Sequence, residues 1–406
     1  MAKRNSGTTW IFLIIIVAAG AAVYFLYPDK IKGMFGEKEK PTQVQPVKPG
    51  EKPDKPVQKP PEPDTTQWGK ALTDGDYDKA LAMVKNGLEE KKIKNVPAAL
   101  LVAGKAASAA NKSEAAAGYL NQVLTEHPQS LEAPEAMAEL MKLRFDTGKL
   151  PDFFTLLQTA AKKYPAHHAT GKVCAQIAPK LYARYKSDKS QWWNVRLAYA
   201  LAYNSAADKS DKKKYTTVLK ELNDYLIFSP AHIKAFPIHQ VAPGENLKSI
   251  GKKYNCTAEL IQQINNIKDP KKLQVGDRLK IITGTASVVV SKKNFSLVLL
   301  LDKLFVREYP VGIGKMNKTP EGEFKVTTRD IEPNWFFNGE RIPYGDDRNL
   351  LGTRWIGLSI KSYGIHGTWK PKTIGEASSN GCIRMLNKHV EELYRFLQTG
   401  DTVVIK

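Results

Sequence analysis

Three patterns of apolar and polar residues divide the chain. Residues 10–27 form an apolar run without a charged side chain, and residues 68–233 place apolar side chains at helical intervals. From Ala286 onward, short runs rich in β-branched and apolar residues alternate with turns. Because 406 residues are too many for one compact core, these patterns predict a multidomain protein with a helical region and a mainly β domain.

Residues 10–27 are predicted to be a transmembrane helix that anchors the chain. Eighteen apolar residues just reach the length that a bilayer core requires. Lys3 and Arg4 precede the run, so residues 1–9 are expected in the cytoplasm, with the later domains of this single-pass protein on the periplasmic or extracytoplasmic side of the cell membrane. A cleaved signal peptide is the alternative, because Ala19-Gly20-Ala21 has the small residues of a cleavage site. The apolar run continues beyond them, which favours the inner-membrane anchor.

Residues 28–67 have the composition of a Pro/Lys/Glu-rich linker. From Glu37 to Gln67 there is almost no apolar content, and eight prolines recur among lysines and glutamates. Such a segment cannot bury a core, and proline favours extended polyproline II backbone. At roughly 3 Å per residue, the linker would hold the following domains up to about 90 Å from a membrane.

Residues 68–233 are predicted to be a helical region built from hairpins. Its helical units end near Pro128, Pro165 and Pro230, and the first interval of 37 residues approaches the period of about 34 residues of tetratricopeptide repeats. This TPR-like resemblance is loose, because the second interval is 65 residues. We expect a small helical array that either binds a protein partner or serves as a spacer.

Residues 238–282 are predicted to be a small βααβ module. A strand at Ile238 precedes a Pro-Gly turn, two brief helical patterns follow, and Leu273–Ile281 turns into a closing strand. The Val-x-x-Gly-Glu-x-Leu opening, the central Asn265-Asn266 pair and the Leu-x-x-Gly-Asp-x-Leu ending resemble a LysM domain. Members of that family bind glycans containing N-acetylglucosamine, such as peptidoglycan or chitin, so the resemblance implies a glycan partner. A copy that serves only for packing is the alternative.

Residues 286–406 are expected to form a mainly antiparallel β domain. Only one segment, Asn387–Leu397, has a convincing helical pattern. The candidate strands are Val288–Val290, Ser296–Leu301, Leu304–Val311, Gly322–Thr327, Trp355–Ser359 and Thr402–Lys406.

Cys382 and His366 are the residues of this β domain that best fit a catalytic pair. A free thiol is only a few per cent ionised at neutral pH, so nucleophilic catalysis needs a neighbouring base or positive charge. Histidine is the usual base because it titrates near neutrality. His366 precedes Cys382 by 16 residues, with a loop rich in glycine and serine between them, so the two can fold back into contact. An inert buried thiol and a core histidine are the alternative.

Four motifs decide between these alternatives. All four lie within residues 286–406: Ile365-His366-Gly367-Thr368, Ser379-x-Gly-Cys-Ile-Arg384, Lys318–Phe324 and Leu351–Ile356. Together they resemble the L,D-transpeptidase catalytic domain of the YkuD type, over about residues 286–406.

The resemblance implies a cysteine transpeptidase that acts on the stem peptides and glycan strands of peptidoglycan. Cys382 thiolate would attack the carbonyl before the terminal D-alanine of a stem tetrapeptide, and His366 would accept the thiol proton and later protonate the leaving amine. An acceptor amine would then resolve the thioester, typically into a 3–3 cross-link. Water as acceptor would make the enzyme an L,D-carboxypeptidase. A catalytically weak scaffold that only binds the wall is a further alternative.

The loop before the nucleophile is expected to stabilise the oxyanion. The backbone N–H groups of Gly381 and Cys382 are the candidate donors, and Ser379 and Asn380 complete the loop. The family often has Ser-His-Gly-Cys here, whereas this chain has Asn380 in place of that histidine. Asparagine forms hydrogen bonds but cannot carry a proton. Because His366 supplies the base in the family's mechanism, we expect the change to be tolerated.

Substrate binding is expected at Arg384, Gly367 and Thr368, which flank the predicted pair. Arg384 would either pair with a substrate carboxylate or brace the loop from behind, and the sequence leaves both roles open.

The positive charge of the chain suits a polyanionic partner but does not decide for one by itself, because lysines that only solvate helices and the linker account for part of the excess. There are 61 Lys and Arg against 41 Asp and Glu, a formal net charge of +20, which suits nucleic acid, an anionic membrane face or an acidic wall polymer. No Arg-Gly-aromatic RNA motif or zinc-finger spacing is present, and the predicted export signal argues against a nucleic-acid partner.

The remaining cysteines and histidines predict no further chemistry. Three widely spaced cysteines make no disulfide framework, so Cys174 and Cys256 are expected to pack in cores. The pair His167-His168 lacks metal-ligand spacing, so we expect neither a metal nor another cofactor.

Overall fold

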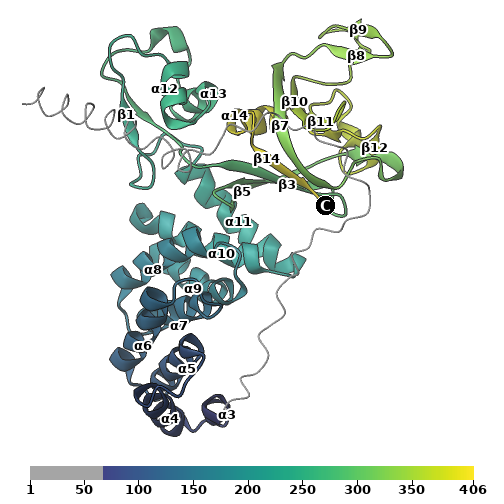
Figure 1. Cartoon of the computed structure of the whole chain (residues 1–406). Helices are drawn as coiled ribbons and strands as arrows, with labels where there is room; N and C mark the ends of the chain where they lie inside the picture. Colours follow the sequence, from purple (N-terminus) through teal and green to yellow (C-terminus); the bar gives the residue numbers. More distant parts are fainter. Residues whose placement is uncertain (1–66) are drawn as a thin grey trace, which may run out of the picture. The chain divides into compact units, whose positions relative to one another are not determined.

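The computed structural model describes residues 67–406 (Figure 1). The predicted cytoplasmic residues 1–9, the transmembrane helix 10–27 and the linker up to residue 66 lie outside the described residues and stay predictions. In the described part, no helix is long and apolar enough to cross a bilayer.

The predicted helical region is confirmed as a series of packed helices. Polar caps and proline at the first helical positions begin several of them; Asp76 and Asn95, for example, accept backbone N–H groups at the starts of α4 and α5. A Cβ on Gly104 of α5 would lie 2.6 Å from Leu120 of α6, so these two helices pack too closely for any larger residue. The TPR-like assignment stays a prediction. The helices are α3 (Gln67–Thr73), α4 (Tyr77–Glu89), α5 (Val96–Ala109), α6 (Ser113–Glu126), α7 (Ala133–Asp146), α8 (Leu150–Lys163), α9 (His168–Tyr185), α10 (Trp192–Ser205) and α11 (Lys209–Leu226).

The βααβ module has the predicted order. Strands β1 (Ile238–Gln240) and β2 (Arg278–Lys280) pair antiparallel around the helices α12 (Leu247–Tyr254) and α13 (Ala258–Ile264). The asparagine that follows the second helix ties this helix to β2. The side chain of Asn265 donates to the carbonyl of Lys280 at 2.8 Å and accepts the N–H of Lys280 at 2.8 Å.

The C-terminal domain is built on one eight-stranded sheet with the strand order β13-β11-β10-β7-β14-β3-β4-β5. Most neighbours are antiparallel as predicted, but β11 pairs parallel with β13 and β14 pairs parallel with β3. The predicted helix is α14 (Asn387–Phe396), which contacts β10 and β11. The strands are β3 (Ala286–Ser291), β4 (Ser296–Leu301), β5 (Leu304–Pro310), β7 (Gly322–Ile331), β10 (Arg354–Leu358), β11 (Gly364–His366), β13 (Ile383–Arg384) and β14 (Thr402–Ile405), with the separate pairs β6 (Ile313–Gly314) and β12 (Ala377–Ser379), and β8 (Trp335–Phe337) and β9 (Glu340–Ile342).

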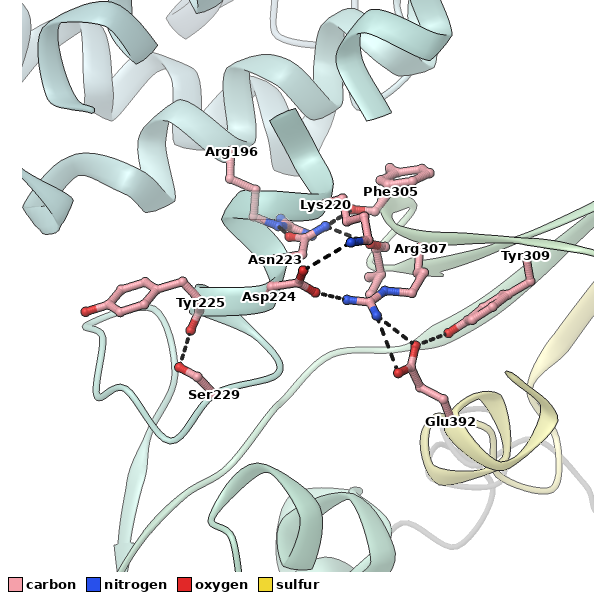
Figure 2. Close-up of polar contacts among 11 residues, drawn as sticks. Arg196, Lys220, Asn223, Asp224, Tyr225, Ser229, Phe305, Arg307, Tyr309 and Glu392 are labelled. Atoms are coloured by element: carbon pink, nitrogen blue, oxygen red, sulfur yellow. Dashed lines mark hydrogen bonds and ion pairs between the residues drawn. The ribbon is translucent and has the colours of Figure 1, made fainter. Parts of the chain in front are cut away.

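The edge strand β5 is covered by the helical region (Figure 2). Arg196 of α10 is fully buried and donates to the carbonyl of Phe305 at 3.1 Å and to the Asn223 side chain at 2.7 Å. Asn223 of α11 donates to the carbonyl of Val306 at 2.8 Å. Two buried side chains thus satisfy carbonyl groups that a sheet edge would leave unpaired.

An ion network continues this contact toward α14 (Figure 2). Arg307 of β5 pairs with Asp224 of α11 and, at 3.3 Å, with Glu392 of α14, and Tyr309 donates to Glu392 at 2.7 Å. The last helix of the helical region, α11, and the C-terminal helix α14 therefore both contact β5 through Arg307.

Candidate active site

The pairing of β11 with β13 brings the segments that carry the two predicted catalytic residues side by side. In this parallel register, Ile365 lies opposite Ile383 and His366 lies opposite Arg384. Side chains alternate along a strand, so the two isoleucines share one face and are buried there. His366 and Arg384 share the other face. Cys382 lies one residue before the start of β13, and the charge of Arg384 acts on both Cys382 and His366.

Cys382 keeps part of its surface exposed, unlike the other two cysteines of the chain. Its Sγ lies 3.6 Å from the carbonyl oxygen of Ser362. Burial raises the pKa of the Cys382 thiol, while a backbone hydrogen bond from Gly364 and the positive charge of Arg384 act in the opposite direction. The raised pKa favours the neutral thiol, so a nucleophilic role of this sulfur would require a base.

His366 is buried and held by its backbone surroundings. Its Nδ1 lies 2.6 Å from the carbonyl oxygen of Gly367, and its ring stacks on Trp355 at 5.9 Å between centroids. A carbonyl only accepts, so Nδ1 carries the proton in the neutral ring and Nε2 keeps its lone pair. Burial lowers the pKa of His366 to about 4, with a smaller lowering by Arg384. At neutral pH the imidazole is thus uncharged and able to accept a proton.

No hydrogen bond joins Cys382 Sγ to His366 among the contacts of residues 67–406. The sulfur faces the carbonyl of Ser362 and the imidazole faces that of Gly367. Catalytic hydrogen bonds are often long until a substrate is bound, so the informative observation is the pairing of the strands next to the two residues.

The loop that contains Cys382 is held by two hydroxyl groups. Ser379 Oγ donates to the carbonyl of Cys382 at 2.7 Å and accepts the N–H of Gly381 at 3.0 Å. Thr319 Oγ1 donates to the carbonyl of Gly381 at 2.8 Å and accepts the N–H of Gly314 at 2.7 Å. The N–H of Gly381 is therefore already engaged in this conformation. Of the two predicted oxyanion donors, the Cys382 N–H is the better candidate.

Position 381 tolerates only glycine. Its φ is +136°, and an added Cβ would lie 2.5 Å from the ring of Tyr363. Gly381 therefore lets the loop of Cys382 pass close to Tyr363, the residue before the strand that carries His366.

Asn387 was not singled out by the sequence, which marks it only as the start of a helix. Its Oδ1 accepts the N–H groups of Thr368 at 3.0 Å and Thr353 at 3.3 Å. A Cβ on Gly367 would lie 2.2 Å from this oxygen, and one on Gly352 would lie 2.3 Å from it. Asn387 thus fixes the loop that follows His366. The only sign of this role in the sequence was the glycines at positions 352 and 367, which leave room for its side chain.

The other predicted site residues lie around this pair. Arg384 is half-buried, and its Nη1 lies 3.5 Å from Ser378 Oγ, while its buried Nε has no partner in the described chain. Thr368 is buried, and its Oγ1 accepts the N–H of Lys370 at 3.0 Å. Asn380 is exposed. The substrate-binding roles of Arg384, Gly367 and Thr368 stay predictions.

Cys174 and Cys256 lie in cores, where burial raises the pKa of both thiols. Within residues 67–406, no three His, Cys, Asp or Glu side chains are grouped as a metal site requires.

Comparison with known proteins identifies two families in the chain. Residues 285–405 match the YkuD family, described as the L,D-transpeptidase catalytic domain, and residues 239–281 match the LysM domain. The YkuD protein of Bacillus licheniformis, named for L,D-transpeptidase activity, is 34% identical over 176 residues, 41% of this chain and 98% of its own length. The YqjB protein of Bacillus subtilis, named in the same way, is 38% identical over 130 residues, 30% of this chain and 73% of its own length.

An L,D-transpeptidase structure from Mycobacterium tuberculosis H37Rv is 18% identical, with a TM-score of 0.27, and the match covers 33% of this chain and 63% of that one. The Bacillus relatives are matched over most of their length at more than 30% identity. The chain therefore belongs to the L,D-transpeptidase family with a YkuD-type catalytic domain, and it carries a LysM domain in front of that domain.

Proposed function

We propose that this chain is a peptidoglycan L,D-transpeptidase that works through a thioester on Cys382. The observation that supports the proposal is the pairing of β11, which ends at His366, with β13, which begins one residue after Cys382. Family membership supports the reaction class, because the relatives are named for this activity.

The first half-reaction would use the pair as nucleophile and base. Cys382 sulfur forms a bond to the carbonyl carbon that precedes the terminal D-alanine, and its proton passes to Nε2 of His366. The C–N bond then breaks, the proton moves to the leaving amine, and D-alanine departs. A thioester remains on Cys382.

The second half-reaction would depend on the acceptor. An amine of another stem peptide attacks the thioester, gives its proton to His366 and forms a 3–3 cross-link, and the thiol is restored. Water in the place of the amine would release a shortened stem peptide, which is the carboxypeptidase outcome of the same chemistry.

The decisive experiment measures D-alanine release from disaccharide tetrapeptides by residues 67–406. We expect Cys382→Ala to abolish release, and Cys256→Ala, a substitution at a cysteine remote in sequence from the pair, to retain it. Mass spectrometry of the products separates cross-linked dimers from shortened monomers. Release that persists in Cys382→Ala would refute the thioester mechanism. Wild-type protein that binds the wall polymer but releases nothing would instead favour a scaffold.

The rest of the chain would place this activity at the wall. The LysM and catalytic domains imply peptidoglycan binding. Residues 10–27 would anchor the protein in the cell membrane with both domains on the extracytoplasmic side, and the helical region would offer a surface to a protein partner. Protease treatment of intact and permeabilised spheroplasts tests the orientation, since the catalytic domain should be digested without permeabilisation.

A further inference from the structure

A polar groove lies where the LysM module meets the catalytic domain. Its volume is about 710 Å³. The LysM wall includes Gln262, Asn266 and Lys268, and the catalytic wall consists of Arg354 and Arg395.

The two walls of the groove are tied to each other. Thr257 of the LysM module donates a hydrogen bond to the carbonyl of Arg395, at the end of α14. Gln398 donates to the carbonyl of Asn255 at 2.9 Å. Arg395 lines the groove, and both contacts join the two domains whose residues form its walls.

The charges along the groove are mostly uncompensated. Three cations line it against one carboxylate, that of Glu259. Within residues 67–406 neither Arg395 nor Lys268 forms an ion pair, and the Arg354 guanidinium donates to a carbonyl, that of Thr353, at 2.6 Å. Guanidinium groups without a carboxylate partner are suited to bind carboxylates, and the amide side chains beside them suit hydroxyl and amide groups.

The groove is separate from the catalytic face. Trp355 lies opposite His366 in the sheet and stacks on its ring. Arg354, one residue earlier, points to the other face, where its guanidinium lies 5.5 Å from the ring of Tyr394 on α14. A ligand in the groove would therefore not be the stem peptide that reacts at Cys382.

We propose that this groove is a second contact site for peptidoglycan, in which the carboxylates of stem peptides on a held strand pair with Arg354, Arg395 and Lys268. The inference rests on the proposed function, because it takes peptidoglycan as the polymer. The groove retains the wall polymer while a different stem peptide reacts on the opposite face of the sheet.

The test compares two forms of the insoluble polymer: intact peptidoglycan, and the same material after enzymatic removal of its stem peptides. Residues 67–406 should bind the intact form more tightly. The double variant Lys268→Gln, Arg395→Gln should lose roughly tenfold in affinity for the intact form and nothing for the stripped glycan, since rim charge pairs contribute modestly and the effect should fade with added salt.

The matched control is Lys252→Gln, Arg278→Gln, which removes the same charges from exposed LysM positions outside the groove. It should bind like wild type. D-alanine release from a soluble tetrapeptide reports the catalytic pair separately and should be unchanged in both variants. Equal binding of wild type and groove variant to intact peptidoglycan would overturn the groove proposal. If the wild-type protein released no D-alanine from the soluble tetrapeptide, the proposed function would be overturned instead.

Discussion

At the scale of single residues, the buried hydroxyl group of Thr319 is one of the two that hold the loop of the proposed nucleophile, Cys382. Thr319 joins Gly314, in β6, to Gly381, the residue before Cys382. Replacing it by valine keeps the volume but leaves a buried N–H and a buried carbonyl without partners, at a cost of about 1–3 kcal/mol for such groups. The loop that presents the sulfur would then lose its fixed position.

We therefore expect Thr319→Val to reduce kcat for D-alanine release by at least roughly tenfold, because small misplacements of a reacting atom are costly. Thr319→Ser restores the hydroxyl and should recover most of the rate. Urea unfolding measures the loss of stability. The rate of thiol alkylation at Cys382 reports whether the loop that carries this residue has become more accessible. A valine variant with the wild-type rate would show that the bridge does not position the nucleophile.

The buried imidazole predicts a specific dependence on pH. The pKa of His366 is lowered to about 4, whereas an unfolded chain has a histidine pKa near 6.5. Between these values the unfolded chain binds more protons than the folded one, so acidification through this window should destabilise the fold by up to a few kcal/mol. Above about pH 6.5 this contribution to the pH dependence vanishes.

The same lowered pKa sets the acid limb of the reaction. His366 should remain an unprotonated base down to about pH 4, so D-alanine release should persist at pH 5 and fall below it. Comparing kcat/KM with the free energy of unfolding of wild type and His366→Gln separates the two effects. The variant should lose activity and also the His366 share of the acid destabilisation. An acid limb centred near pH 6.5 would contradict a buried imidazole.

At the scale of elements, local patterns predict what local physics determines. The helix starting at Asn387 and the strand Ser296–Leu301 follow from apolar periodicity and turn residues, and the structure has both. The LysM order follows from its motifs in the same way. The pair Cys382 and His366 was recognisable because its neighbours in sequence carry the family's pattern.

The contacts that hold the site were less accessible to the sequence, because they join segments far apart in the chain. Thr319 and Gly381 are 62 residues apart. Asn387 acts on a loop 19 residues earlier, at Thr368. A hydroxyl or amide acquires such a role only when the sheet is assembled, and a single sequence gives no sign of which distant backbone group it will meet. Parallel pairing of β11 with β13 also had no local signal.

The edge of the sheet offers a test at this scale. Asn223 is fully buried, accepts a hydrogen bond from Arg196 and donates to the carbonyl of Val306. Asn223→Ala would leave the Arg196 guanidinium and the Val306 carbonyl without these hydrogen bonds, and we expect a loss of about 2–4 kcal/mol in the free energy of unfolding. Lys220→Ala on the same helix removes an exposed partner of Asp224 and should cost less than about 0.5 kcal/mol. Urea denaturation of the two variants measures both losses of stability. Equal stabilities of the two variants would contradict the stabilisation of the β5 edge by Asn223 of α11.

At the scale of the whole described chain, the helical region is part of the catalytic body. The sequence left a spacer or a partner-binding array open, but α10 and α11 pack on β5. The LysM module joins the same body, because the buried amine of Lys280 donates to the carbonyls of Leu226 at 2.6 Å and Ser229 at 2.9 Å. These carbonyls lie at and just beyond the end of α11, where a cation is favourably placed.

A fragment of residues 234–406, which keeps the LysM and catalytic domains, tests this dependence. Removing the helices exposes the carbonyls of Phe305 and Val306 on an open strand edge, removes both acceptors of Lys280 and uncovers the apolar surface of β5. We expect the fragment to have a Tm at least about 5 °C below that of residues 67–406, and to self-associate in gel filtration, because an uncovered edge strand is a template for pairing with another chain.

Residues 67–406 with an inserted protease site between Ser229 and Lys234 give the matched comparison, since cleavage there breaks the chain but leaves the helices free to stay bound. If the cleaved protein stays associated and active while the fragment does not, the helices act through the covered edge. A fragment as stable and monomeric as the longer protein would show instead that the sheet needs no cover.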